Sequence, residues 1–162
     1  NYPFDYWDLL EKGKSIDREY WLQQQISVNA KRLNEILEKI KPYVQMTDSI
    51  PVIFCGDFNA GSHLDWVEAT KHLNKGYVIR FPNSILMEKN GFRDSFREIH
   101  PDPVKERGIT WSPAFANAFK DRIDYIYYKG DQVKPVHSYT ISKHPVKYPS
   151  DHASVVTAFN FK

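Results

Sequence analysis

Apolar residues recur every three or four positions from Asp17 to about Tyr43, which is the spacing of one face of an α-helix. The series consists of Leu22, Ile26, Leu33, Ile36, Leu37 and Ile40. Ser15 or Asp17 is suited to cap the start, because short polar side chains accept hydrogen bonds from the first backbone amides. Pro42 is expected to help end the helix. The pattern predicts one long amphipathic helix whose apolar stripe packs on a core.

A continuous apolar run at residues 50–55 follows and does not alternate with polar positions. Such a run is typical of a strand that is covered on both faces. Cys55, the single cysteine of the chain, ends this run. We expect Cys55 to be a small core residue, with a reactive thiol as the alternative, and no disulfide within the chain.

Two shorter helices are predicted next. Ser62 and Asp65 resemble a capping box at the start of a helix over about residues 62–73. A further helix is expected over residues 83–90, closed by Gly91. The remaining strands of a sheet are therefore expected in the second half of the chain.

The second half of the chain is rich in β-favouring residues. Four segments fit strands, at residues 109–111, 122–128, 132–142 and 153–159. The tripeptide Lys-Gly-Asp at residues 129–131 predicts a tight hairpin turn. We expect the last three strands to lie antiparallel to one another.

Length and composition indicate one folded unit over residues 1–162. The chain is 41% hydrophobic, which suffices for one ordinary core and leaves too little for two domains. The net charge is +2 without a long run of like charge, so the composition does not require a polyanionic partner. No stretch approaches the ~20 consecutive apolar residues that cross a bilayer, so we expect no membrane span. Neither charge nor cysteine content favours one compartment.

Polar side chains that are suited to catalysis follow the first predicted strand. Asp57 and Asn59 lie in the segment Gly-Asp-Phe-Asn, two residues apart, and are expected to face the same side. Asp57 is suited to accept a hydrogen bond from an attacking water, and Asn59 to donate one to a phosphate oxygen. The alternative is a common turn in which an Asp bonds to its own backbone.

A second group of candidates surrounds the last two strands. Arg122 and Asp124 share one face of a strand, and a charged side chain there needs a partner. For Asp124 we expect His152, because a carboxylate on one imidazole nitrogen fixes the tautomer and favours the charged ring. A structural ion pair between Asp124 and an arginine is the alternative. Asp151, beside His152, is an oxygen donor of the kind that Mg²⁺ or Mn²⁺ prefers, although an isolated Ser-Asp-His is also a common solvated loop.

Trp111 ends a short strand beside a proline-stiffened loop, at Thr-Trp-Ser-Pro. An indole there is suited to line the site and to pack on a sugar or a base of a substrate. Packing in the core or at its rim is the alternative.

The three motifs occur in the order Gly-Asp-Phe-Asn, Arg-Ile-Asp-Tyr and Ser-Asp-His, and this set resembles the endonuclease/exonuclease/phosphatase superfamily. The superfamily includes deoxyribonuclease I, apurinic endonucleases similar to exonuclease III, neutral sphingomyelinases and inositol-polyphosphate 5-phosphatases. The resemblance implies a metal-dependent hydrolase that attacks phosphorus in line with water, using Mg²⁺ or Mn²⁺. It implies that Asp57, Asn59, Asp124 and His152 are catalytic and that Asp151 binds the metal. Asn59, Trp111 and Arg122 would contact the substrate.

The same resemblance implies an α/β four-layer αββα sandwich of the deoxyribonuclease I type, with the active site between its two halves. Residues 1–162 match the C-terminal half, so this chain would supply roughly one sheet with its helices. An asparagine, a metal-binding glutamate and a histidine of the family's N-terminal half have no counterpart here. We therefore expect that the N-terminal half of the domain is a missing partner.

Two classes of function remain after this comparison. The first is a phosphoesterase acting on nucleic acid, sphingomyelin-type phospholipids or inositol phosphates. The second is a non-catalytic binding module, or an inactive half-domain, that retains the fold. Retention of the five polar residues at positions 57, 59, 124, 151 and 152 favours the first class.

Overall fold

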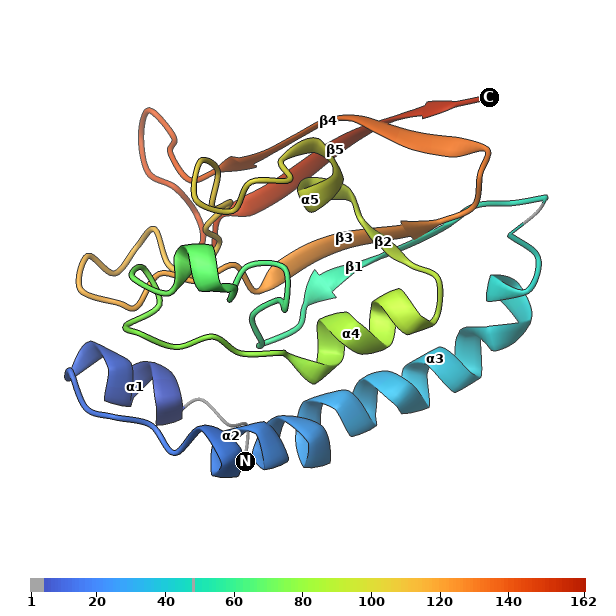
Figure 1. The fold of residues 1–162 in the computed structure, drawn as a ribbon. Helices are drawn as coiled ribbons and strands as arrows, with labels where there is room; N and C mark the ends of the chain where they lie inside the picture. Colours follow the sequence, from blue (N-terminus) through green and yellow to red (C-terminus); the bar gives the residue numbers. More distant parts are fainter. Residues whose placement is uncertain (1–4, 48) are drawn as a thin grey trace.

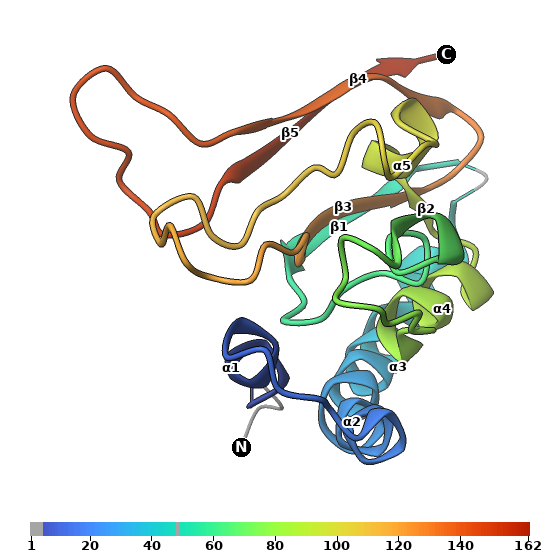
Figure 2. The ribbon, with the colours of Figure 1, turned by 60° about the vertical axis from the view of Figure 1, so that its left-hand side comes forward.

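The computed structural model describes residues 5–47 and 49–162. Helices and two small antiparallel sheets are stacked in layers, with the helices α2 and α3 at the bottom of Figure 1 and the pair β4–β5 at the top. A three-stranded sheet of β1, β3 and β2 lies between them, and Figure 2 shows the same order from another side. None of the helices in the described ranges is long and apolar enough to span a bilayer.

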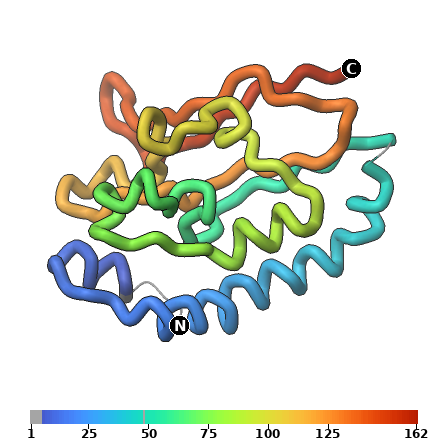
Figure 3. The backbone as a smooth tube through the Cα atoms, in the orientation of Figure 1, coloured from blue at the N-terminus to red at the C-terminus, as the bar shows by residue number. Residues whose placement is uncertain are grey.

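The long amphipathic helix predicted from the apolar stripe is present, in three consecutive segments. These are α2 (Arg18–Gln25), a π-helical turn at Ile26–Ala30 and α3 (Lys31–Val44). Figure 3 shows them as one continuous rod along the base of the molecule. Asp17 caps the start, since its side chain accepts a hydrogen bond from the backbone N–H of Tyr20 at 3.0 Å.

The helix ends at Val44, close to the predicted end at about Tyr43 and two residues after Pro42. Proline removes one backbone donor, but the residues after it still bond to the preceding turn. The amide of Gln45 donates to the carbonyl of Lys41 at 3.0 Å, for example. A proline in the last turn is therefore tolerated here.

The three-stranded sheet has β3 (Asp124–Lys129) at its centre. It pairs antiparallel with β1 (Val52–Asp57) on one side and with the short β2 (Arg93–Asp94) on the other. One face packs on the stripe of α3 in a core cluster of Leu33, Leu37, Met87, Phe92, Tyr125 and Tyr127. The apolar stripe of the long helix therefore packs on a core, as predicted.

The opposite face of β1 is uncovered, which corrects the prediction of a strand covered on both sides. Ile53 is 46% exposed, and Cys55, two residues further along the same face, is also exposed. The expectation of a buried Cys55 is therefore wrong. A continuous apolar run does not reveal whether its second face is covered by residues of the same chain.

The other helices flank this sheet. They are α1 (Asp5–Glu11), α4 (Pro82–Lys89), which confirms the helix predicted before Gly91, and α5 (Ser95–Ile99). The helix predicted over residues 62–73 is wrong, because that segment consists of turns with a single 3₁₀ turn at Glu68–Thr70. Ser62 accepts a hydrogen bond from the amide of Leu64 at 3.1 Å, while the carboxylate of Asp65 serves arginines elsewhere in the fold.

The last strands form a hairpin of their own. β4 (Val133–Ile141) pairs antiparallel with β5 (Ser154–Phe161), as predicted. β3 does not join them through hydrogen-bonded pairing, so the expectation of three consecutive antiparallel strands holds for two only. Ser95 connects the two sheets, since its hydroxyl donates to the carbonyl of Ile126 at 2.6 Å and lies 3.0 Å from the hydroxyl of Thr157.

A second core cluster is dominated by aromatic rings from α1, α2 and the turns after β1. Its members are Tyr6, Trp7, Leu10, Ile16, Trp21, Ala60, Trp66, Ile79, Phe81, Phe119 and Ile123. Asp121 is enclosed by this cluster and is 3% exposed. Its Oδ1 accepts a hydrogen bond from the Trp66 indole at 3.1 Å.

Asp121 is expected to make the stability of the fold depend on pH. Burial raises the pKa of its carboxyl to about 7. Between about pH 4, the usual pKa of an unfolded aspartate, and pH 7 the folded chain therefore binds one proton more than the unfolded chain. The free energy of unfolding should fall across this window as the pH rises, by up to about 4 kcal/mol, and stay level with respect to this group above it.

Urea unfolding at pH 5 and pH 8 checks this expectation. In Asp121→Asn the amide oxygen can still accept the Trp66 bond, but the group no longer titrates. The variant should lose less stability than the wild type between the two pH values. The same pH dependence in both proteins would contradict a titrating Asp121.

Candidate functional site

Two carboxylates meet where β1 and β3 pair. Asp57 is the last residue of β1 and Asp124 the first of β3, and the antiparallel register places them directly opposite each other. Residues in such a pair point to the same face of the sheet. The face is the one turned away from α3, because Tyr125 and Tyr127 on the other face belong to the core cluster.

Asn59 and Asp57 form a compact turn after β1. The two oxygens of Asp57 accept hydrogen bonds from the backbone N–H and the side-chain amide of Asn59, both at 2.8 Å. Asn59 has a φ of 48°, a left-handed conformation that asparagine tolerates better than most residues. The self-bonded turn weighed from the sequence is thus present, and it holds the carboxylate and the amide together on one side.

Two further contacts hold this turn from outside. The side-chain amide of Asn29, on the π-helical turn, donates to the carbonyl of Asn59 at 3.2 Å. The hydroxyl of Tyr125 donates to the carbonyl of Ala60 at 3.0 Å. The turn is therefore fixed by a helix on one side and by the central strand on the other.

His152 approaches from the loop before β5 and pairs with Asp124 as predicted. Its Nδ1 lies 2.9 Å from Oδ2 of Asp124, so an Nδ1–H donor leaves Nε2 free to face a substrate. Although burial lowers the pKa of His152, the hydrogen bond with Asp124 and the charges of Asp124, Asp57 and Asp151 raise it by more. The pKa of this imidazole is consequently above its usual value.

The pKa of Asp57 is also raised, chiefly because its carboxyl, on a residue that is otherwise exposed, is partly shielded from water. The amide of Asn59 opposes this shift by bonding to the charged form, and the negative charge of Asp124 adds to it. A carboxylate with a raised pKa is a stronger base than a solvated one. The arrangement thus combines a basic carboxylate with an imidazole biased toward its charged form.

Trp111 packs at the rim of the aromatic core, as the alternative interpretation predicted, and it also lies beside His152. Its ring lies edge-on to the His152 ring with centroids 4.9 Å apart, and its backbone bridges to His152 and to Asp121. The indole is partly exposed and borders a cavity of about 270 Å³ that Asn59 also lines. The side chain is therefore available to a ligand beside the carboxylates.

Asp151 lies next to His152 on the exposed loop. Its backbone carbonyl accepts a hydrogen bond from the hydroxyl of Ser112 at 2.5 Å, which fixes the loop beside Trp111. The exposed side chain is suited to contribute one oxygen to a cation.

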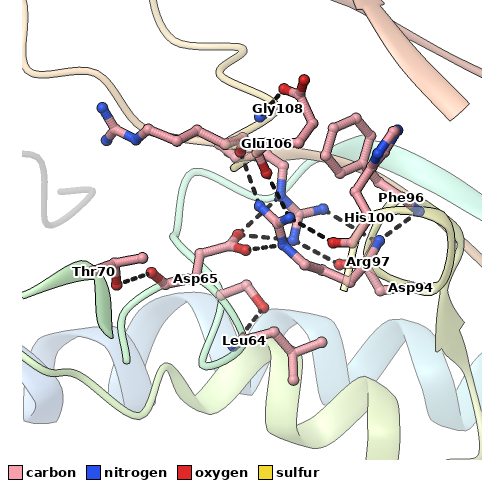
Figure 4. Close-up of polar contacts among 12 residues, drawn as sticks. Leu64, Asp65, Thr70, Asp94, Phe96, Arg97, His100, Glu106 and Gly108 are labelled. Carbon is pink, nitrogen blue, oxygen red and sulfur yellow. Dashed lines mark hydrogen bonds and ion pairs between the residues drawn. The ribbon is translucent and has the colours of Figure 1, made fainter. Parts of the chain in front are cut away.

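Arg122 is not at the surface of the site, which corrects the substrate contact expected for it. It is 1% exposed, and its guanidinium bonds to both oxygens of Asp94, at 3.1 and 2.7 Å, and to Asp65 at 2.7 Å. Asp65 also pairs with the buried Arg97, which in addition donates to the carbonyls of His100 and Glu106 (Figure 4). Arg122 therefore has a structural role beneath the strand that carries Asp124.

Comparison with known proteins identifies the family of the chain. The model of a family described as the Endonuclease/Exonuclease/phosphatase family matches residues 45–152, which include every candidate site residue. The chain belongs to this family. Family membership implies a fold of the deoxyribonuclease I type, and members of the family are typically hydrolases that use a divalent metal ion.

A curated relative covers a larger share of the chain than the family model does. The chain is 36% identical over 145 residues to the uncharacterized protein F14F9.5 of Caenorhabditis elegans. The match covers 77% of this chain and 46% of the relative, so the chain spans less than half the length of that protein.

The residues of the described ranges do not complete a metal site of the kind the family uses. Among them, no group of three or more histidine, cysteine, aspartate or glutamate side chains is placed to hold a metal ion. A hard divalent cation needs about six oxygen ligands, some of them water. Asp151 alone does not satisfy that requirement.

Asn29 is a site residue that the sequence reasoning missed. It is 6% exposed and occupies a position on the buried side of the long helix, four residues after the buried Gln25 and four before Leu33. A polar residue at that spacing needs a buried hydrogen-bond partner, which is a signal that the apolar pattern alone does not use. The π-helical turn, a feature often found at functional sites, marks the same place.

Proposed function

We propose that this chain is part of a divalent-metal-dependent phosphoesterase that hydrolyses a phosphodiester or a phosphomonoester by in-line attack of water. The observation that carries the proposal is the convergence of Asp57, Asp124 and His152 from three distant segments. Family membership supports the reaction class. A nucleic acid is the first substrate class to test, with sphingomyelin-type lipids and inositol phosphates as the others.

Each side chain has a role that follows from its contacts. Asp57 orients and deprotonates the attacking water, helped by its raised pKa. The charged His152 ring, held by Asp124, donates from Nε2 to a phosphoryl oxygen and stabilises the negative charge that develops there. Asn59 donates from its amide to the phosphate, and Trp111 packs against the substrate. These groups act by positioning and charge, so no covalent intermediate is required.

We infer that Mg²⁺ or Mn²⁺ is the cofactor and that Asp151 is the ligand contributed by this chain. The metal would neutralise charge on the phosphate when bound. The remaining ligands would come from the N-terminal half of the same domain, packed on the uncovered face of β1 to complete a four-layer αββα sandwich. Exposed Ile53 and Cys55 support such an association, because apolar strand faces are normally covered.

A substrate panel tests the proposed function with the natural full-length protein. Plasmid DNA, bis(p-nitrophenyl) phosphate and sphingomyelin are incubated with Mg²⁺, with Mn²⁺ or with a chelator. Hydrolysis of at least one substrate is expected, and the chelator should lower its rate by a factor of about 100 or more, since a metal contributes several kcal/mol to such reactions.

The competing function is a binding module without catalysis. The full-length protein would then hydrolyse none of the substrates with either metal while still binding one of them. Such a result would refute the phosphoesterase proposal.

A further inference from the structure

Two buried amide side chains connect the long helix to the turn that follows β1. Gln25 is fully buried and Asn29 is 6% exposed. The amide of Asn29 donates to Oε1 of Gln25 at 2.8 Å and to the backbone carbonyl of Asn59 at 3.2 Å. Asn59 in turn donates to both oxygens of Asp57. These residues form a chain of hydrogen bonds from the helix to Asp57, which we call the amide relay.

The π-helical turn places Asn29 at this position. The backbone N–H of Lys31 donates to the carbonyl of Ile26, five residues earlier, so this turn is wider than an α-helical one. Single π-helical turns occur frequently at functional sites. The local widening of the helix therefore coincides with the residue that bonds to Asn59.

Gln25 is unfavourable for the stability of the core. Its Nε2 is buried and has no hydrogen-bond partner within residues 5–47 and 49–162. An unpaired buried amide destabilises a fold relative to an apolar side chain of similar shape. Packing alone would therefore favour an apolar residue at this position. What glutamine supplies, and an apolar residue does not, is the acceptor for the amide of Asn29.

Asn59 needs support from outside its own turn. Its φ of 48° lies in the left-handed region, which is strained for residues other than glycine. A cavity of about 290 Å³, whose lining includes Asn29, Asp57 and Asn59, borders the turn, so packing does not hold it on that side. The bond from Asn29 fixes the peptide group that follows Asn59 and thereby stabilises the left-handed conformation.

We propose that Gln25 and Asn29 are positioning residues for phosphoester hydrolysis, which hold Asn59 where its amide bonds to Asp57 and to the phosphate together. The inference rests on the proposed phosphoesterase function. The side-chain amide of Asn59 has two hydrogens, so one bonds to Asp57 while the other faces the substrate. A turn that relaxes by about 1 Å moves both groups away from the reacting atoms, and such displacements lower rates by up to about 10²-fold.

Gln25→Met in the natural full-length protein separates positioning from folding. Methionine has a similar length, but it provides no strong acceptor for Asn29 and leaves no amide unpaired. The urea midpoint should stay unchanged or rise. In contrast, kcat for the substrate hydrolysed fastest should fall by a factor of about three or more, with KM changed by less than about twofold. Unchanged kcat would overturn the inference.

Asn29→Leu removes the donor itself and should lower kcat by a factor of about ten or more, again with KM nearly unchanged. Asn74→Leu is the matched control. Asn74 is 3% exposed, and its amide donates to the carbonyl of Asp65 at 3.3 Å and to the hydroxyl of Thr70 at 3.2 Å. This control should lower the urea midpoint about as much as Asn29→Leu but retain the kcat of the wild type. Equal losses of kcat in the two variants would overturn the inference.

Hydrogen exchange in the free protein reports on the relay without catalysis. The backbone N–H of Asn59 donates to Asp57 at 2.8 Å. In Asn29→Leu this amide should exchange at least about tenfold faster than in the wild type, whereas Asn74→Leu should not change its exchange. Mass spectrometry of the peptide that contains Asn59 measures the rate. Unchanged exchange in Asn29→Leu would overturn the inference.

The two proposals fail in different ways. A wild-type protein that hydrolyses no substrate of the panel refutes the proposed function and the role of the relay in it. An active wild type together with an equally active Asn29→Leu variant retains the proposed function and refutes the relay alone.

Discussion

Replacing Asp57 by asparagine is expected to lower kcat for phosphoester hydrolysis by a factor of about 10²–10⁴, the usual contribution of a positioned general base. The amide of the variant has no basic lone pair to accept a proton from water. The fold should persist, because Asp57 lies at the exposed end of β1 and its backbone pairing is retained. Steady-state kinetics with a metal ion and circular dichroism of the same sample provide the two measurements.

His152→Gln should cause a loss of similar size, and the double variant should lose little more than either single variant. Non-additivity is expected because both residues act on one transition state. Asp102→Asn and His137→Gln change an aspartate and a histidine elsewhere on the surface and serve as controls. Full activity of Asp57→Asn, or equal losses in the controls, would refute the assigned roles.

Arg122→Met is expected to reduce the free energy of unfolding by about 3–5 kcal/mol, as happens when one partner of a buried ion pair is removed. The substitution removes the two hydrogen bonds that Arg122 donates to the buried Asp94, whose carboxylate then retains only the backbone amides of Phe96 and Arg97 as donors. Asp65 retains Arg97 as its remaining guanidinium partner. Methionine retains much of the side-chain volume, so the loss arises mainly from charge. Urea denaturation at pH 7 measures the change.

Arg18→Met provides the matched control, because Arg18 is exposed at the start of α2. Its effect should be within about 0.5 kcal/mol. A loss below about 1 kcal/mol in Arg122→Met would mean that the four buried charges contribute little to the fold.

The role of Arg122 was not predictable from the sequence for a physical reason. Its partners Asp65 and Asp94 are 57 and 28 positions away, and a strand pattern contains no information about such pairings. The failed helix over residues 62–73 has the same origin. Asp65 resembles a capping residue locally, but in the fold it accepts hydrogen bonds from Arg97 and Arg122.

Two features could be predicted, the first from a local pattern and the second from the chemistry of one side chain. The long helix follows from its apolar period, and the pairing of Asp124 with His152 follows from the need of a strand carboxylate for a partner. The π-helical turn and the contact of Asn29 with Asn59 could not be derived, because they depend on how the helix lies against the turn after β1. The cavity beside Trp111 likewise could not be derived, because it depends on the contact of Trp7 in α1 with Trp111.

Cys55 is a natural attachment point for a spectroscopic label. It is exposed, it is the single cysteine of the sequence, and it lies two residues before Asp57 on the same strand face. In residues 1–162 a spin label or a fluorophore can therefore be attached to this thiol without any engineered substitution. The label would occupy the strand face that the N-terminal half of the domain is proposed to cover, so labelling should prevent the two halves from associating.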